Sequence, residues 1–145
     1  MPTASASDDR QILLLDTSTA LALMLEDHER HGAVLSAARS RRLGLAGHAW
    51  FEAYSVLTRL PSGRRRSPSG AHRLLAHNFP NSRFLDAEDM DSLGAELAER
   101  GISGGAVYDA LVAAAARQHG LRLLTADARA RPTYEAMGVR LIRLK

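Results

Sequence analysis

The sequence contains no cysteine among its 145 residues, which excludes disulfide bonds and thiolate metal sites and fits a reducing cytoplasm. It also lacks an apolar run near the roughly 20 residues that span a bilayer. The longest, residues 12–25, is interrupted by the polar residues 16–19. The first ten residues, MPTASASDDR, lack the basic and apolar segments of a secretory signal. We therefore expect a cytoplasmic protein with no membrane segment, preceded by a disordered extension over residues 1–10.

Lysine is nearly absent as well. Lys145 is the one lysine, so arginine supplies almost all of the positive charge behind the net charge of +3. The planar guanidinium group of arginine matches phosphate oxygens better than the ammonium group of lysine does. An arginine-rich surface therefore favours RNA or an acidic partner. A GC-rich genome that encodes arginine in place of lysine explains the same composition. The charge alone leaves both explanations open.

Short apolar runs alternate with longer helical patterns along the chain. We expect strands over residues 12–15, 43–46, 83–85, 122–125 and 139–142. We expect helices over residues 19–25, 28–41, 49–60, 87–100, 106–119 and 128–137. This alternation predicts one α/β domain over residues 11–145, with helices on both faces of a central, mainly parallel sheet of four to five strands. Residues 60–71, LPSGRRRSPSGA, are expected to form a loop.

Four carboxylates interrupt the apolar pattern near one edge of the predicted sheet. Asp16 directly follows the first strand, and Asp127 lies two residues beyond the end of the fourth. Glu52 and Asp109 lie near the starts of two helices, each on a face of otherwise apolar or small residues. Sites in open parallel sheets form outside the carboxyl ends of the strands, so we expect the four acids to converge.

Each acid also has an ordinary structural explanation. Asp16 and Asp127 could cap the following helices, Glu52 could pair with an arginine, and Asp109 could favour the positive end of its helix dipole. Four converging carboxylates, however, repel one another unless a cation neutralises them. Hard oxygen ligands without histidine or cysteine suit Mg²⁺ or Mn²⁺. The acids together therefore predict a divalent metal site.

Four separated motifs carry a resemblance to a known family: LLLDTSTALALM, FEAYSVLTRLP, GGAVYDALVAAAA and LLTADARARPTYEAMGV. Over residues 11–145 the chain resembles PIN-domain proteins, specifically the VapC-like toxins of bacterial toxin–antitoxin pairs. The resemblance implies a three-layer α/β/α fold and a divalent-metal-dependent ribonuclease that a cognate antitoxin holds inactive. It also suggests a homodimer. It places the catalytic and metal-binding acids at Asp16, Glu52, Asp109 and Asp127.

Supporting roles follow from the same resemblance. Thr17 and Ser18 match the small polar pair after the first acid, and Thr125 matches a hydroxyl residue that often accompanies the fourth. Arg129 and Arg131 follow Asp127 closely and are expected to contact phosphate or antitoxin.

A non-catalytic module is the main alternative function. Such a module would bind RNA or an antitoxin and use the acids as a cation-stabilised cluster. His72, His77 and His119 offer no catalytic spacing, the His28 and His31 pair has no third ligand nearby, and His48 could contact substrate. This pattern disfavours metal-independent histidine chemistry. The arginine run Arg64, Arg65 and Arg66 either grips RNA phosphates or antitoxin acids, or only solvates a loop. Metal-supported cleavage, rather than binding, separates the two functions.

Overall fold

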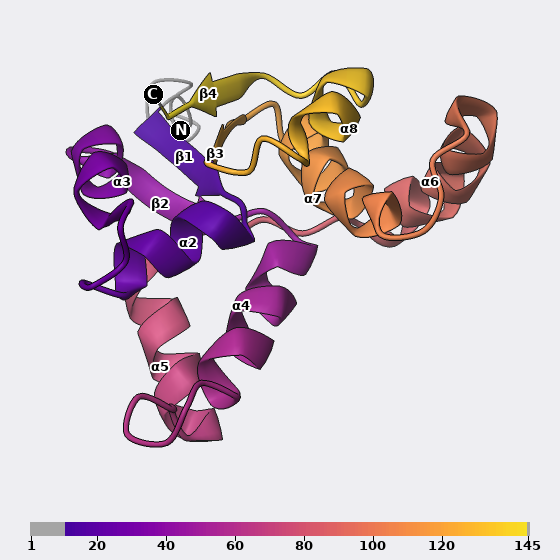
Figure 1. Ribbon diagram of the computed structural model, residues 1–145. Coiled ribbons are helices and arrows are strands. Elements are labelled where there is room, and N and C mark those ends of the chain that lie inside the picture. Colours follow the sequence, from indigo (N-terminus) through magenta and orange to yellow (C-terminus); the bar gives the residue numbers. More distant parts are fainter. Residues whose placement is uncertain (1–10, 145) are drawn as a thin grey trace, which may run out of the picture.

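Four parallel strands form the central sheet of the structure, a computed structural model that describes residues 11–144 (Figure 1). They are β1 (Ile12–Leu15), β2 (Arg42–Leu45), β3 (Arg122–Thr125) and β4 (Leu141–Arg143), in the order β2-β1-β3-β4. β1 is buried over its whole length, as expected for a parallel strand that is covered on both faces. The extension predicted for residues 1–10 lies outside the described residues.

The strand order reverses at the centre of the sheet. From β1 the chain crosses to β2 on one side and later returns to β3 on the other side. In open α/β sheets such a switch point opens a crevice at the carboxyl ends of the two strands. Leu15 pairs with Leu124 in the register of β1 and β3. The residues that follow them, Asp16 and Thr125, therefore lie side by side at this crevice.

Seven helices surround the sheet within the described residues. They are α2 (Thr17–Met24), α3 (His31–Ala38), α4 (His48–Thr58), α5 (Pro68–Asn78), α6 (Ala87–Arg100), α7 (Ala106–Gln118) and α8 (Arg131–Ala136). The side chains of β1 alternate between two cores. Leu13 and Leu15 pack with α2 to α5, whereas Ile12 and Leu14 pack with α6 to α8. Cores on both faces of one sheet give the three-layer α/β/α fold that the resemblance implied.

The strand predicted at residues 83–85 is wrong. Arg83 forms one isolated bridge to the sheet, and no strand follows it. The backbone N–H of Leu45 in β2 donates to the Oγ of Ser82 (2.9 Å) rather than to a backbone carbonyl. A side chain therefore takes a place in the ladder that a fifth strand would need, and the segment only runs alongside β2.

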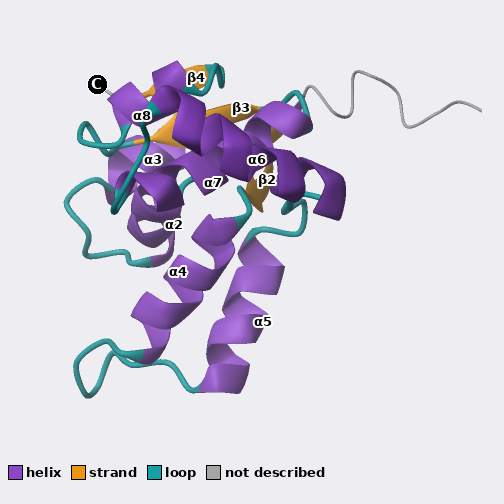
Figure 2. Cartoon of the chain, turned by 90° about the vertical axis from the view of Figure 1, so that its right-hand side faces the viewer, coloured by secondary structure: helices purple, strands orange, loops and turns teal. Residues whose placement is uncertain are grey.

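Helix α5 occupies part of the predicted loop over residues 60–71. The Oγ of Ser67 caps this helix by accepting the backbone N–H of Gly70 (3.1 Å), and Pro68 stands in the first turn, where its missing N–H is not needed. Ala71 and Leu75 are buried, and the helix lies beside α4, with which it projects from the sheet (Figure 2).

Other differences concern helix length. The helices expected over residues 28–41 and 128–137 are the shorter α3 and α8. Between residues 11 and 144, no helix combines the length and the apolar character that crossing a membrane requires.

Candidate active site

Asp16 is the buried centre of the site. It follows β1 as the N-cap of α2, and it is only 2 % exposed. Its Oδ1 accepts hydrogen bonds from the Oγ of Ser18 (2.6 Å) and from the backbone N–H of Thr19 (3.1 Å). The capping role that the sequence left open is therefore present, but it occupies only one of the two carboxylate oxygens.

The second oxygen of Asp16 connects β1 to the chain beyond β3. Oδ2 accepts hydrogen bonds from the Oγ1 of Thr125 (2.6 Å) and from the hydroxyl of Tyr134 (3.0 Å). Burial, together with the negative charge of Asp16, raises the pKa of Tyr134, so its hydroxyl keeps its proton. Ser18 ties the same segments together by accepting the backbone N–H of Ala126 (3.2 Å). The buried charge of Asp16 is thus satisfied by donors from separate parts of the chain.

Asp127 closes the turn after β3. Its Oδ1 accepts the backbone N–H groups of Arg129 (3.0 Å) and Ala130 (3.3 Å), so it caps this turn rather than a helix beginning at residue 128. Its own N–H donates to the Oγ1 of Thr125 (3.0 Å), the hydroxyl that also holds Asp16. Its Oδ2 faces the guanidinium of Arg129 at 3.2 Å.

Asp109 extends from the first turn of α7 to the same arginine. Its side chain is 13 % exposed, and its Oδ2 lies 3.3 Å from Nη1 of Arg129. Burial raises the pKa of Asp109 and Arg129 lowers it, while the charges of Asp127 and Asp16 raise it again. The favourable position at the positive end of the helix is therefore only part of its environment, because Asp109 also senses two other members of the predicted acid set.

Glu52 is the most solvent-accessible of the four acids, with 41 % of its side chain exposed. Its Oε1 lies 3.7 Å from Nε2 of His48, one turn earlier in α4, so a histidine takes the place of the arginine partner that the sequence suggested. Burial raises the pKa of Glu52 and His48 lowers it, while the charges of Asp109 and Asp16 raise it. The ring of His48 stacks on Tyr108, with centroids 5.0 Å apart.

The supporting residues are placed unevenly. Ser18, Thr125 and Arg129 all contact the acids, whereas Thr17 makes no hydrogen bond to them in the described part of the chain. Thr19 was not among the predicted residues. It lies three residues after the N-cap Asp16, at the position whose backbone N–H donates to a cap, so capping rules alone identify it. Tyr134 was missed because no local pattern connects it to an acid 118 residues earlier.

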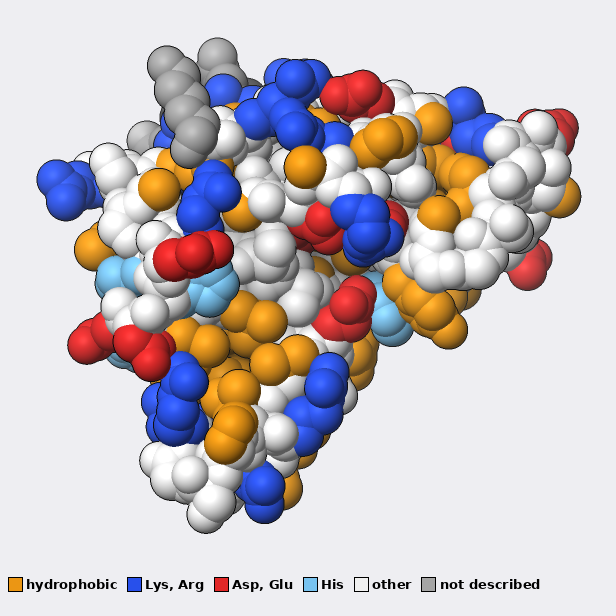
Figure 3. Space-filling model, viewed as in Figure 1, with side chains coloured by type: hydrophobic (Ala, Val, Ile, Leu, Met, Phe, Trp, Pro, Cys, Tyr) orange, Lys and Arg blue, Asp and Glu red, His pale blue; other side chains and the backbone are white. Residues whose placement is uncertain are grey.

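The donor set fits a hard divalent cation in kind, since it consists of carboxylate and hydroxyl oxygens. Within residues 11–144, however, no three Asp, Glu or His side chains stand in an arrangement that could hold an ion as they are. The guanidinium of Arg129 instead lies against both Asp109 and Asp127. On the face drawn in Figure 3, acidic side chains lie next to a basic one near the middle.

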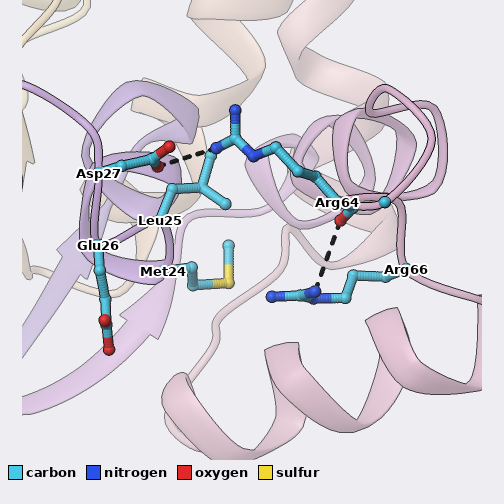
Figure 4. A pocket seen from close by; sticks show the side chains of 7 residues that line it. Met24, Leu25, Glu26, Asp27, Arg64 and Arg66 are labelled. Carbon is cyan, nitrogen blue, oxygen red and sulfur yellow. Dashed lines mark hydrogen bonds and ion pairs between the residues drawn. The ribbon is translucent and has the colours of Figure 1, made fainter.

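The arginine run is located elsewhere and braces its own loop. Arg64 forms an ion pair with Asp27 (2.9 Å) beside a pocket at the end of α2 (Figure 4). Arg65 donates to the carbonyl of Leu60 (2.9 Å), and Arg66 reaches the carbonyl of Arg64 (3.5 Å). Each of the three arginines therefore has a partner within the folded chain.

Comparisons with known proteins identify relatives of this chain. Residues 13–135 match the model of the PIN domain. Over 130 residues the chain is 46 % identical to Ribonuclease VapC27 of Mycobacterium tuberculosis (strain ATCC 25618 / H37Rv), which covers 90 % of this chain and 95 % of the relative. Ribonuclease VapC40 from the same strain is 44 % identical over 125 residues, covering 86 % of this chain and 92 % of the relative.

Solved structures share the fold at lower identity. The crystal structure of Mycobacterium tuberculosis VapC20, a sarcin–ricin loop cleaving toxin, superposes with a TM-score of 0.64 at 21 % identity, covering 88 % of this chain and 95 % of that one. VapBC2 from Rickettsia felis, bound to a DNA fragment from its promoter, superposes with a TM-score of 0.65 at 14 % identity, covering 92 % and 99 %.

Proposed function

Because the chain belongs to the PIN-domain family and, within it, to the VapC-like toxins, we propose that it is a divalent-metal-dependent endoribonuclease and the toxin of a toxin–antitoxin pair. One observation carries the proposal: acids from four separate segments lie close enough at the switch point of the sheet for their charges to influence one another. Glu52 and Asp109 each have a pKa raised by burial and also by the charges of other acids in the set. Such repulsion is what a bound cation would relieve, and it distinguishes these acids from four independent caps.

Asp16, Glu52, Asp109 and Asp127 would hold Mg²⁺ or Mn²⁺. The chemistry that such a cation supplies when bound is activation of water and polarisation of the phosphodiester. Attack by water, rather than by the ribose 2′-hydroxyl, leaves 5′-phosphate and 3′-hydroxyl ends.

Individual residues of this chain have distinct roles in the site. Asp16 is fixed by hydroxyl donors on both oxygens, so its carboxylate is held in one orientation and would exchange one of these hydrogen bonds for a cation. Tyr134 retains its proton and keeps Oδ2 of Asp16 in place. Glu52 is the acid with the most open access to solvent, so it is the member of the set that an arriving cation or RNA strand can reach most directly.

The partners of this chain follow from the same proposal. We propose RNA as the substrate, a cognate protein antitoxin as the inhibitor, a homodimer as the assembly and the cytoplasm as the location. The ribonuclease names of the relatives support RNA as the substrate, and the VapBC2 structure supports an antitoxin as the inhibitor.

The test is incubation of the purified, antitoxin-free protein with total cellular RNA in Mg²⁺ or Mn²⁺, beside an EDTA control. The wild-type protein should cut RNA at discrete sites, and Asp109→Asn should not. Asp86→Asn is the matched control, because Asp86 caps α6 through the N–H of Asp89 (2.8 Å) and asparagine caps equally well. This variant should cleave like the wild type.

Two outcomes would contradict the proposal. Cleavage that persists in EDTA, or in Asp109→Asn, would show that the acids and a cation are not the catalytic groups. Absence of cleavage by a folded protein that binds both metal and RNA would favour the non-catalytic binding module.

A further inference from the structure

Arg129 makes two ion pairs with the acids at once. Its Nη1 lies 3.3 Å from Oδ2 of Asp109, and its Nη2 lies 3.2 Å from Oδ2 of Asp127. We propose that Arg129 is a displaceable counter-ion, which neutralises this pair of acids until a divalent cation replaces it and then turns to the RNA backbone phosphate. This inference rests on the proposed function, and it assigns Arg129 two successive positions.

The pairing is needed because the acids are close enough to influence one another. Asp109 is largely buried, and the charges of Asp127 and Asp16 act against its ionisation while Arg129 favours it. Without a cation, ionised carboxylates at this edge repel one another. The guanidinium supplies positive charge from within the chain, which offsets part of this repulsion before any ion arrives.

The pairing is also weak enough to be given up. Both contacts are longer than the 2.7–2.9 Å usual for a tight charge-assisted pair, and 68 % of the Arg129 side chain is exposed. The ion pair of Arg117 with Glu96 is shorter, at 2.7 Å. Exposed ion pairs contribute little stability, so the guanidinium can leave at small cost in free energy.

The backbone provides the pivot for this movement. The N–H of Arg129 is held at 3.0 Å by Oδ1 of Asp127, so the main chain stays in place while the long side chain turns. A divalent cation and a guanidinium repel each other, so they compete for the same carboxylate oxygens. Once displaced, the planar fork remains at the edge where a scissile phosphate must lie, and it matches phosphate oxygens in a bidentate way.

Metal binding tests the first position without relying on activity. Titration of Mn²⁺ by calorimetry should show Arg129→Gln binding the ion about two- to fivefold more tightly than the wild type, since a competing exposed ion pair is removed. Arg100→Gln is the matched control. Arg100 is an exposed arginine paired with Glu96 at 2.8 Å, so the change in net charge is the same, and metal affinity should stay at the wild-type value.

The outcomes separate this inference from the proposed function. Equal or weaker Mn²⁺ binding by Arg129→Gln, while the wild type binds, overturns the displacement and leaves the nuclease proposal intact. Tighter binding in Arg100→Gln as well would reduce the effect to net charge and overturn it too. A wild-type protein that binds no divalent cation contradicts the proposed function itself.

The second position is tested by RNA. Arg129→Gln should raise KM for a single-stranded substrate, and the slope of log(1/KM) against log[salt] should flatten by about 0.7, the value for one phosphate contact on a single strand. Arg129→Lys keeps the positive charge but not the bidentate guanidinium. In this variant the salt slope should return closer to the wild-type value than KM does. An unchanged KM and slope in Arg129→Gln would show that the displaced arginine does not engage the backbone.

Discussion

Substitution of Asp16 by asparagine separates two opposing forces at the site. Repulsion among the acids alone predicts that removing this charge stabilises the metal-free protein. The hydrogen bonds predict the opposite, because the amide nitrogen of asparagine cannot accept them. If the amide oxygen keeps the capping bond to Thr19, the amide nitrogen faces the hydroxyls of Thr125 and Tyr134, both of which donate to the wild-type carboxylate.

The loss of hydrogen bonds outweighs the relief of repulsion among the acids. Two bonds to a charged acceptor are lost, at about 1.5–3 kcal/mol each. The hydroxyl of Tyr134 can turn and accept from the new amide, which restores about 1 kcal/mol. Thr125 is less adaptable, because its Oγ1 already accepts the N–H of Asp127 (3.0 Å). Relief of repulsion returns roughly another 1 kcal/mol. Asp16→Asn should therefore destabilise the protein by about 1–4 kcal/mol.

Urea unfolding at pH 7 in EDTA measures this difference. Asp109→Asn is the comparison, because within residues 11–144 the carboxylate of Asp109 accepts a hydrogen bond from Arg129 alone, and its pKa is raised by burial. A raised folded-state pKa means that the ionised form is disfavoured in the folded protein, so this variant should be as stable as the wild type or slightly more stable. An Asp16→Asn protein that equals or exceeds the wild type in stability would refute the reasoning and show that repulsion outweighs the hydrogen bonds.

Two further predictions concern parts of the fold away from the acids. The hydrogen bond from Arg117 is the main cause that lowers the pKa of Glu96 to about 2, so this carboxylate stabilises the protein above its ordinary pKa and loses that effect as the pH falls towards 2. Glu96→Gln should lower the free energy of unfolding by about 1 kcal/mol at pH 7, after allowance for solvent screening. Thermal unfolding should show that the stability difference between variant and wild type vanishes near pH 2. A difference that stays constant with pH would contradict this link between the Glu96 pKa and stability. Gly44→Ala should cost about 3 kcal/mol or prevent folding, because its Cβ would overlap the carbonyl of Asn81. Gly94→Ala, with no atom near the new methyl group, should instead stabilise its helix by about 0.5–1 kcal/mol, and similar unfolding midpoints for the two variants would refute the close approach.

The sequence predicted the elements whose ends carry a clear chemical signal. β1 and β3 have the predicted bounds, since each is an apolar run that ends at the edge of the sheet. α6 also has its predicted bounds, with Asp86 capping one end and Gly101 in the left-handed conformation (φ 65°) at the other. α5 was missed because Pro68 and Gly70 are typical of loops and only Ala71 and Leu75 of this helix are buried.

The sequence pattern indicates where the four acids stand in the fold but not which residues contact them. The positions of Asp16 and Asp127 after strands, and of Glu52 and Asp109 at helix starts, follow from apolar periodicity. The contacts that determine their behaviour join distant segments, such as Tyr134 with Asp16, or Arg129 with an acid 20 residues earlier. Local pattern contains no record of such pairs, because they depend on how the layers pack.

The chemistry of the cleaved ends tests the central claim most directly. RNA fragments made by the wild-type protein in Mg²⁺ or Mn²⁺ would be mapped for the groups at both sides of each cut. Hydrolysis by water at the carboxylate site predicts 5′-phosphate and 3′-hydroxyl ends that disappear with EDTA. Ends with a 2′,3′-cyclic phosphate and a 5′-hydroxyl would show that the ribose hydroxyl is the nucleophile, and they would contradict the account.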